Sequence, residues 1–286
     1  RAMFSGIWIP LVTPFHHGQV DTAALRQLVR HYEGAGVSGF VALGTTGEAA
    51  LLSQIERYTV LEAIADACGE RTPFLIGVGA TDTRDVCAQI RHYERWNSAG
   101  YLVPPPYYVC PSQAGLRWHY TQVAASTSRA VVLYNVPKRT GVSIAPDTAL
   151  ALAEQPNIIA IKECVAEHFG ALQDGPLDVL SGDDSALLDC LAHGGTGGIL
   201  AGAHLRPELF VALVAHHRAG RIDEARRLAD ALAPLAALLF AEPSRPSDGC
   251  NVAPAILSSR NEHPLLCLPD KESSFSVGAS AFPCGT

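Results

Sequence analysis

The sequence has no long apolar run and no block of basic residues, and each absence removes a class of function. Its 286 residues contain no stretch of about 18 unbroken apolar residues, so we expect no transmembrane helix. The 21 basic residues are outnumbered by 28 acidic ones, which leaves no electrostatic footprint for binding nucleic acid. Residues 1–15 lack a basic segment followed by an apolar one. We therefore expect no signal peptide and a soluble, cytoplasmic protein.

Metal-binding patterns are absent as well. The chain has eight cysteines, but none of them form a CxxC pair with histidines at zinc-binding spacing. Adjacent histidines at 16–17 and 216–217 would point in different directions on any regular element. We expect reduced, mostly buried thiols and no metal site.

What the chain does contain is a regular alternation of short apolar runs and amphipathic stretches. Hydrophobic residues make up 48% and charged residues 17% of the chain, enough for a sizeable core. The apolar runs predict eight strands, at residues 6–11, 40–43, 74–78, 101–103, 130–135, 158–162, 178–181 and 198–200. The amphipathic stretches predict helices at residues 22–34, 53–68, 83–97, 113–127, 146–154, 185–193 and 207–219.

This alternation predicts an α/β fold with a parallel sheet, and the strand count favours a closed (β/α)8 TIM barrel. A doubly wound open sheet is the alternative. We assign residues 1–221 to the barrel and residues 222–243 to an additional C-terminal helix. Prolines, serines and glycines interrupt residues 244–286, which we expect to form an irregular or disordered tail.

Lys162 ends the apolar run IIAIK and is followed directly by Glu163. Functional groups of α/β barrels lie where the strands end, at the C-terminal face. Burial disfavours the ammonium form of a lysine, and the neutral amine is the nucleophile that condenses with a ketone. The alternative is an end-of-strand lysine that points into solvent or pairs with Glu163.

Three other features follow predicted strands. Tyr134 could move protons to and from a carbinolamine and an enamine carbon, or it could be a core tyrosine bonded to the backbone. The loop GTTGE at residues 44–48 offers hydroxyl and N–H groups to a carboxylate, although alone it is only a glycine-rich turn. Arg139 could bind a second carboxylate or could be an exposed loop arginine.

Four segments, in this order, resemble the dihydrodipicolinate synthase and N-acetylneuraminate lyase family of class I aldolases. They are GTTGE at 44–48, YNVP at 134–137, IKE at 161–163 and SGDD at 181–184. The likeness spans residues 6–242, and four motifs in register are highly specific. Arg139 follows YNVP at the spacing typical of the dihydrodipicolinate synthase branch.

The resemblance implies a Schiff-base mechanism that needs no metal or organic cofactor. Lys162 would condense with the ketone of pyruvate, and Tyr134 would act as general acid and base. Thr45 and Tyr108 would join Tyr134 in a proton relay, with Tyr108 reaching into a neighbouring subunit. The active form would then be a homo-oligomer, a dimer or a tetramer.

The resemblance also implies the substrate contacts. Thr45 and Thr46 would hold the pyruvate carboxylate, while Gly182 and Ile199 would line the pocket through backbone groups. Arg139 would bind the carboxylate of L-aspartate 4-semialdehyde. The product would be 4-hydroxy-tetrahydrodipicolinate, in lysine and diaminopimelate biosynthesis.

The chain departs from the family pattern in two places. Gln54 and Arg57 stand where feedback-regulated members often carry histidines, so we do not expect inhibition by lysine. Residues 244–286 match none of the family's C-terminal helices, which suggests an altered reading frame or a lineage-specific replacement and a weaker assembly.

Two rival functions remain open. One is a sister aldolase that uses the same lysine on sialic acid, a 2-keto-3-deoxy sugar acid or a hydroxy-oxo-acid. The other is a non-catalytic barrel that binds pyruvate or another 2-oxo acid as a sensor. Arg139 argues against the first, and the set of Lys162, Tyr134 and Thr45 argues against the second.

Overall fold

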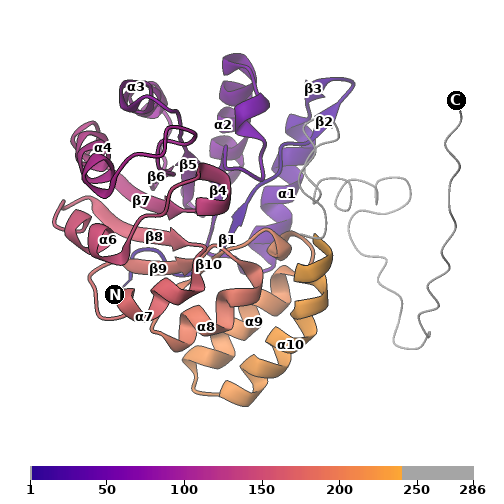
Figure 1. The fold of residues 1–286 in the computed structure, drawn as a ribbon. Coiled ribbons are helices and arrows are strands. Elements are labelled where there is room, and N and C mark those ends of the chain that lie inside the picture. The colour runs from indigo at the N-terminus through magenta and orange to yellow at the C-terminus, as the bar shows by residue number, and fades with distance from the viewer. Residues whose placement is uncertain (1, 240–286) are drawn as a thin grey trace, which may run out of the picture.

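The computed structural model describes residues 2–239, which form a closed barrel of parallel strands surrounded by helices (Figure 1). Barrel strands that follow one another along the chain are neighbours in the barrel, and the last strand pairs with the first. They are β1 (Gly6–Pro10), β4 (Gly39–Ala42), β5 (Phe74–Gly77), β6 (Gly100–Val103), β7 (Ala130–Asn135), β8 (Ile158–Glu163), β9 (Asp178–Ser181) and β10 (Gly197–Ile199). The predicted (β/α)8 barrel is confirmed, and the open-sheet alternative is wrong.

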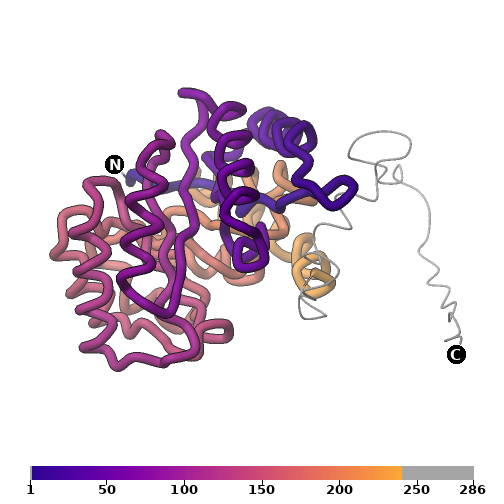
Figure 2. Tube along the Cα trace, turned by 90° about the horizontal axis from the view of Figure 1, so that it is seen from above, coloured from indigo at the N-terminus to yellow at the C-terminus, as the bar shows by residue number. Residues whose placement is uncertain are grey.

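The helices lie outside the barrel. They are α1 (Thr22–Gly34), α2 (Gln54–Cys68), α3 (Thr83–Tyr93), α4 (Gln113–Ala125), α5 (Pro137–Thr140), α6 (Pro146–Leu152), α7 (Phe169–Leu172), α8 (Leu187–Ala192), α9 (Pro207–Arg218) and α10 (Ile222–Leu239). The expected additional helix is α10, which packs against α9 and is the last coloured helix of the tube in Figure 2. The tail predicted for residues 244–286 lies outside the described residues.

The predicted strands agree with the observed ones to within one residue at each end. Some other segments differ from the prediction. The predicted helix 83–97 ends at Tyr93, because the chain then turns and the Trp96 N–H donates to the Tyr93 carbonyl at 3.1 Å. This turn lets the Trp96 indole donate to Glu62 at 2.9 Å. The short hairpin of β2 (Phe15–His16) and β3 (Gln19–Val20) and the turn of helix α5 were not predicted.

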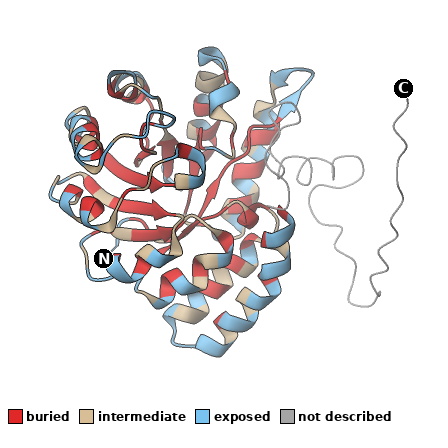
Figure 3. Cartoon of the chain, in the orientation of Figure 1, coloured by how far each residue is buried: buried red, intermediate tan, exposed pale blue. Residues whose placement is uncertain are grey.

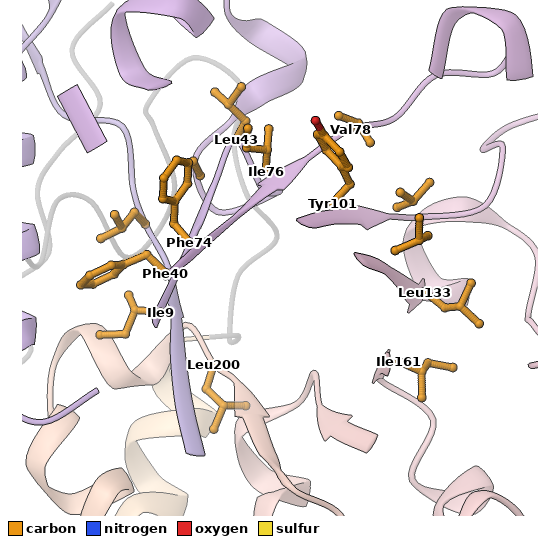
Figure 4. Packing of buried hydrophobic residues seen from close by; sticks show 14 of the residues in the cluster. Ile9, Phe40, Leu43, Phe74, Ile76, Val78, Tyr101, Leu133, Ile161 and Leu200 are labelled. Atoms are coloured by element: carbon orange, nitrogen blue, oxygen red, sulfur yellow. The ribbon is translucent and has the colours of Figure 1, made fainter. Parts of the chain in front are cut away.

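Side chains on the barrel strands alternate between two buried layers. The outer layer packs between strands and helices, and Figure 4 shows part of it, with Ile9, Phe40 and Leu133 among the labelled side chains. The inner layer fills the barrel and includes Tyr134 and Ile199. Figure 3 shows the result, with buried strands at the centre and helices exposed on their outward faces.

Local sequence signals set where the helices begin. The Asp21 carboxylate accepts from the Ala24 N–H at 2.8 Å and caps α1. Ser53 and Glu56 form a reciprocal capping box at the start of α2. The second cap fixes the end of the loop that carries residues 44–48.

His204 is a buried histidine between the end of β1 and helix α1. Its Nε2 accepts from the Val12 N–H at 3.3 Å and its Nδ1 donates to the Ala201 carbonyl at 2.8 Å. The Tyr32 hydroxyl donates to its backbone carbonyl. Burial lowers the pKa of His204 to about 4, so the folded protein keeps the ring neutral.

We expect His204 to make the free energy of unfolding depend on pH in the acidic range. Because its folded-state pKa lies below the ordinary value, the unfolded chain binds the extra proton between about pH 6.5 and 4. The stabilisation is complete above that window and decreases, by up to about 3 kcal/mol, as the pH falls through it. Urea unfolding should therefore show the stability gap between wild type and His204→Gln shrinking from about pH 7.5 to about pH 4.5. A gap that stays constant would contradict this.

Candidate active site

Strand β8 directs Lys162 into the barrel and Glu163 to the outside. Lys162 is only 6% exposed, and it faces Tyr134 across the β7–β8 register. Its Nζ lies 4.3 Å from the centroid of the Tyr134 ring, a cation–π distance. The two alternatives for Lys162, a solvent-exposed side chain and a pair with Glu163, are therefore wrong.

Gly182, directly after β9, leaves room for the lysine. A Cβ atom at this position would lie 2.4 Å from Cys164 Sγ and 3.1 Å from both Lys162 Cγ and Lys162 Cε. Only a residue without a side chain allows Lys162 and Cys164 to pack against this backbone. The structure thus places Gly182 against the lysine that the sequence singled out.

The loops after β9 and β10 are joined by a buried carboxyl group. Asp184 Oδ1 accepts from the Gly202 N–H at 2.7 Å, while Asp184 Oδ2 is buried and has no hydrogen-bond partner. Burial raises the pKa of Asp184 to about 6, and the charge of Lys162 acts in the opposite direction. Ile199, which ends β10, lies in the same buried inner layer as Tyr134.

A pocket of about 310 Å³ opens beside Tyr134. Thr45 and Glu48, from the loop after β4, lie on its wall, and it extends to Arg57 and Tyr107. The Thr13 hydroxyl fixes the loop by donating to the Gly47 carbonyl at 2.7 Å. Thr45 is exposed and Thr46 is half-buried, so the two residues predicted to bind the pyruvate carboxylate differ in solvent exposure.

Two of the predicted site residues lie at the surface of the single chain. Tyr108 is 91% exposed, on a turn where its φ is 73°, so its side chain does not pack into the site of its own chain. Arg139 is exposed on α5, directly after the end of β7. It lies close enough to Cys164 for its charge to influence the pKa of that thiol.

Sequence reasoning missed two parts of the site. It treated Cys164 as one of several buried thiols, although the two-residue period of a strand places Cys164 on the same side as Lys162. Burial raises the pKa of Cys164 to about 11, and the charges of Lys162 and Arg139 act against that shift. It also missed the hydrogen bonds that join Asn135, Glu163 and His168, which no local pattern reveals.

Among residues 2–239, no group of three or more histidine, cysteine, aspartate or glutamate side chains could hold a metal ion. No helix in the same range is long and apolar enough to span a membrane.

The geometry defines a class of protein: a (β/α)8 barrel with a buried lysine and a tyrosine facing each other where two strands end, the usual place of a barrel enzyme's active site. The model of the dihydrodipicolinate synthetase family matches residues 3–249. The chain belongs to this family.

Individual relatives agree with this assignment. A 4-hydroxy-tetrahydrodipicolinate synthase of Geobacter sp. (strain M21) is 38% identical over 84% of each chain. The chloride-inhibited dihydrodipicolinate synthase of Acinetobacter baumannii, solved with pyruvate, superposes with a TM-score of 0.81 at 34% identity, over 85% of this chain and 86% of that one. A structure described as the first monomeric dihydrodipicolinate synthase variant gives a TM-score of 0.82 at 31% identity, over 84% of this chain and 83% of that one.

Gly182→Ala is expected to lower the free energy of unfolding by about 1–3 kcal/mol, because the new methyl group overpacks Cys164 and Lys162. Gly34→Ala is the matched control, since nothing lies within 4 Å of a Cβ atom at that position. A helical alanine there should stabilise the protein by up to about 1 kcal/mol. Urea unfolding of both variants measures the difference, and equal effects would contradict the tight packing at Gly182.

Proposed function

We propose that this protein is a Schiff-base lyase that condenses pyruvate with L-aspartate 4-semialdehyde to give 4-hydroxy-tetrahydrodipicolinate. The observation that carries the proposal is the buried Lys162 amine, which faces the Tyr134 ring at 4.3 Å in a chain of this family. The names of the relatives support the same reaction. The reaction belongs to lysine and diaminopimelate biosynthesis.

Chemistry begins at Lys162. The neutral amine attacks the ketone carbon of pyruvate, and loss of water gives a protonated imine that acts as the electron sink. Removal of a methyl proton then gives an enamine. The enamine carbon bonds to the aldehyde carbon of the second substrate. The amino group of that substrate then displaces Lys162 from the imine carbon, which closes the ring and frees the enzyme.

Tyr134 is the proposed proton carrier. Its ring already lies against the lysine, so its phenol needs no large movement to serve the carbinolamine and the enamine carbon. Thr45 lines the same pocket as Tyr134, which supports a relay between the two hydroxyls. Tyr108 from a second subunit would complete the relay, since its side chain is free to reach outward.

Pyruvate binding is assigned to the groups around the lysine. Thr45 and Thr46 would hold the carboxylate through hydroxyl and N–H groups, while Gly182 and Ile199 would contribute backbone groups. The close packing of Gly182 against Lys162 supports this arrangement, because it brings that backbone beside the carbon that the amine attacks. The imine provides the electron sink, so the mechanism requires no cofactor.

Assembly and location are part of the proposal. We infer a homo-oligomer, a dimer or a tetramer, because the relay needs Tyr108 from a partner chain. One structural relative is described as a monomeric variant, so subunit number is a property to measure for this chain. The proposed biosynthetic role fits a cytoplasmic enzyme.

The direct test supplies purified protein with pyruvate and one aldehyde at a time. We expect turnover with L-aspartate 4-semialdehyde. We expect little turnover with N-acetylmannosamine or with the sugar aldehydes that condense with pyruvate to give 2-keto-3-deoxy sugar acids. Preference for a sugar aldehyde would favour the sister aldolases. Binding of pyruvate without turnover of any aldehyde would favour the non-catalytic barrel.

Arg139→Ala should separate the two substrates. Loss of its charge-assisted hydrogen bonds to a carboxylate should raise KM for L-aspartate 4-semialdehyde about 10- to 100-fold. KM for pyruvate should change little. Lys138→Ala is the matched control, because Lys138 is an exposed base on the same turn. Equal effects of the two variants on the semialdehyde would contradict a specific role for Arg139.

A further inference from the structure

Glu163 is a fully buried carboxyl group next to Lys162 in the chain, with 0% of its surface exposed. Asn135 Nδ2 lies 2.8 Å and 3.0 Å from its two oxygens. The Val165 N–H donates to Oε1 at 2.7 Å, and His168 Nδ1 lies 3.1 Å from Oε2. Both oxygens of the carboxyl group are therefore hydrogen-bonded.

Placing a carboxyl group here is unfavourable unless its partners compensate. Burial raises the pKa of Glu163, while the hydrogen bonds from Val165, Asn135 and His168 lower it. An apolar side chain of similar volume would avoid this desolvation and often gives equal or greater stability. A function beyond stability would explain why the group is a carboxyl.

The position of the network suggests that function. In the β7–β8 register, Tyr134 pairs with Lys162, and the next pair is Asn135 with Glu163. The first pair faces the barrel interior and the second faces outward. The amide and the carboxyl thus hold the two strand ends together one residue beyond the reacting groups.

Asn135 extends the same network. Its Oδ1 accepts from the Ile144 N–H at 2.9 Å, and its backbone carbonyl accepts from the Cys164 N–H at 3.0 Å. The network therefore fixes the end of β7, the end of β8 and the segment before α6. In the sequence, Arg139 lies between the end of β7 and the segment before α6.

We propose that Glu163, held by Asn135 and His168, is a positioning residue that sets the Lys162 amine against the Tyr134 ring. The proposal rests on the proposed function of Lys162 and Tyr134. Glu163 acts through the strand ends and touches no substrate. Its removal should slow proton transfer between Tyr134 and the imine more than it weakens pyruvate binding.

The test measures exchange of pyruvate methyl hydrogens for deuterium by NMR, without any aldehyde. This exchange needs both the imine on Lys162 and the proton carrier. Glu163→Gln should lower kcat for exchange by about tenfold or more, since small displacements of reacting groups have effects of this size. KM for pyruvate should change less than about threefold, because binding groups are untouched. Borohydride should still trap pyruvate on the variant at full stoichiometry.

Glu94→Gln is the matched control. Glu94 is likewise a carboxylate with hydrogen-bond partners, since it accepts from the Thr127 hydroxyl and pairs with Arg129 at 3.2 Å. It lies at the end of α3, away from the strand ends that carry Lys162 and Tyr134. It should leave exchange unchanged. An equal loss in both variants would mean a general structural effect and would overturn the proposal, as would wild-type exchange in Glu163→Gln.

A double variant keeps the test decisive if Glu163→Gln fails to fold. Combining Asn135→Asp with Glu163→Gln exchanges amide and carboxylate. The Ile144 and Val165 N–H groups can still donate to residues 135 and 163, whereas the 3.5 Å bond from Asn135 Nδ2 to the Ile144 carbonyl is lost. Exchange should recover to within about threefold of wild type, as expected for coupled neighbours. A folded double variant that exchanges slowly would overturn the proposal. A wild type that traps no pyruvate would instead contradict the proposed function itself.

Discussion

The Lys162 amine lies inside a closed barrel, against the face of the Tyr134 ring instead of in water. This contact depends on the two-residue period of β8, which turns Lys162 inward and Glu163 outward. The neighbouring parallel strands β7 and β8 pair in the register that places Tyr134 beside Lys162. Gly182, at the end of β9, leaves the space that the side chain occupies. The fold therefore determines the reactive pair through strand alternation, register and one missing side chain.

The sequence predicted the features that depend on local pattern. All eight strands were located, because apolar runs bounded by amphipathic stretches are visible without tertiary information. The four-residue α7 has no counterpart among the predicted helices, since Gly170, Gly175 and Pro176 interrupt the helical pattern of that unit. Lys162 and Tyr134 were chosen because both end strands, and the structure brings them together.

Features that depend on distant contacts could not be predicted in this way. Beyond the end of α3, the Trp96 ring packs against Tyr93, the last residue of α3, and against Tyr58, and such contacts do not show in a helical period. The bond between Asn135 and Glu163 joins residues 28 positions apart. The role of Tyr108 depends on a second chain, so one sequence and one subunit leave it a prediction.

Two buried carboxyl groups hold the strand ends near the lysine and form no ion pair with it. Asp184 joins the loops after β9 and β10, and Glu163 joins the ends of β7 and β8. Both are buried, and burial raises the pKa of each. Together they fasten four consecutive strand ends around one amine, which is the pre-organisation that a Schiff-base enzyme requires.

The central claim is that Lys162 forms an imine with pyruvate, and borohydride trapping followed by peptide mass mapping tests it most directly. The chain contains three lysines, Lys138, Lys162 and Lys271, so the site of an adduct can be assigned without ambiguity. One reduced pyruvate adduct per chain, on Lys162 and absent from Lys162→Ala, is the predicted result. A folded wild-type protein that gains no adduct, or gains it on Lys138 or Lys271, would contradict the claim.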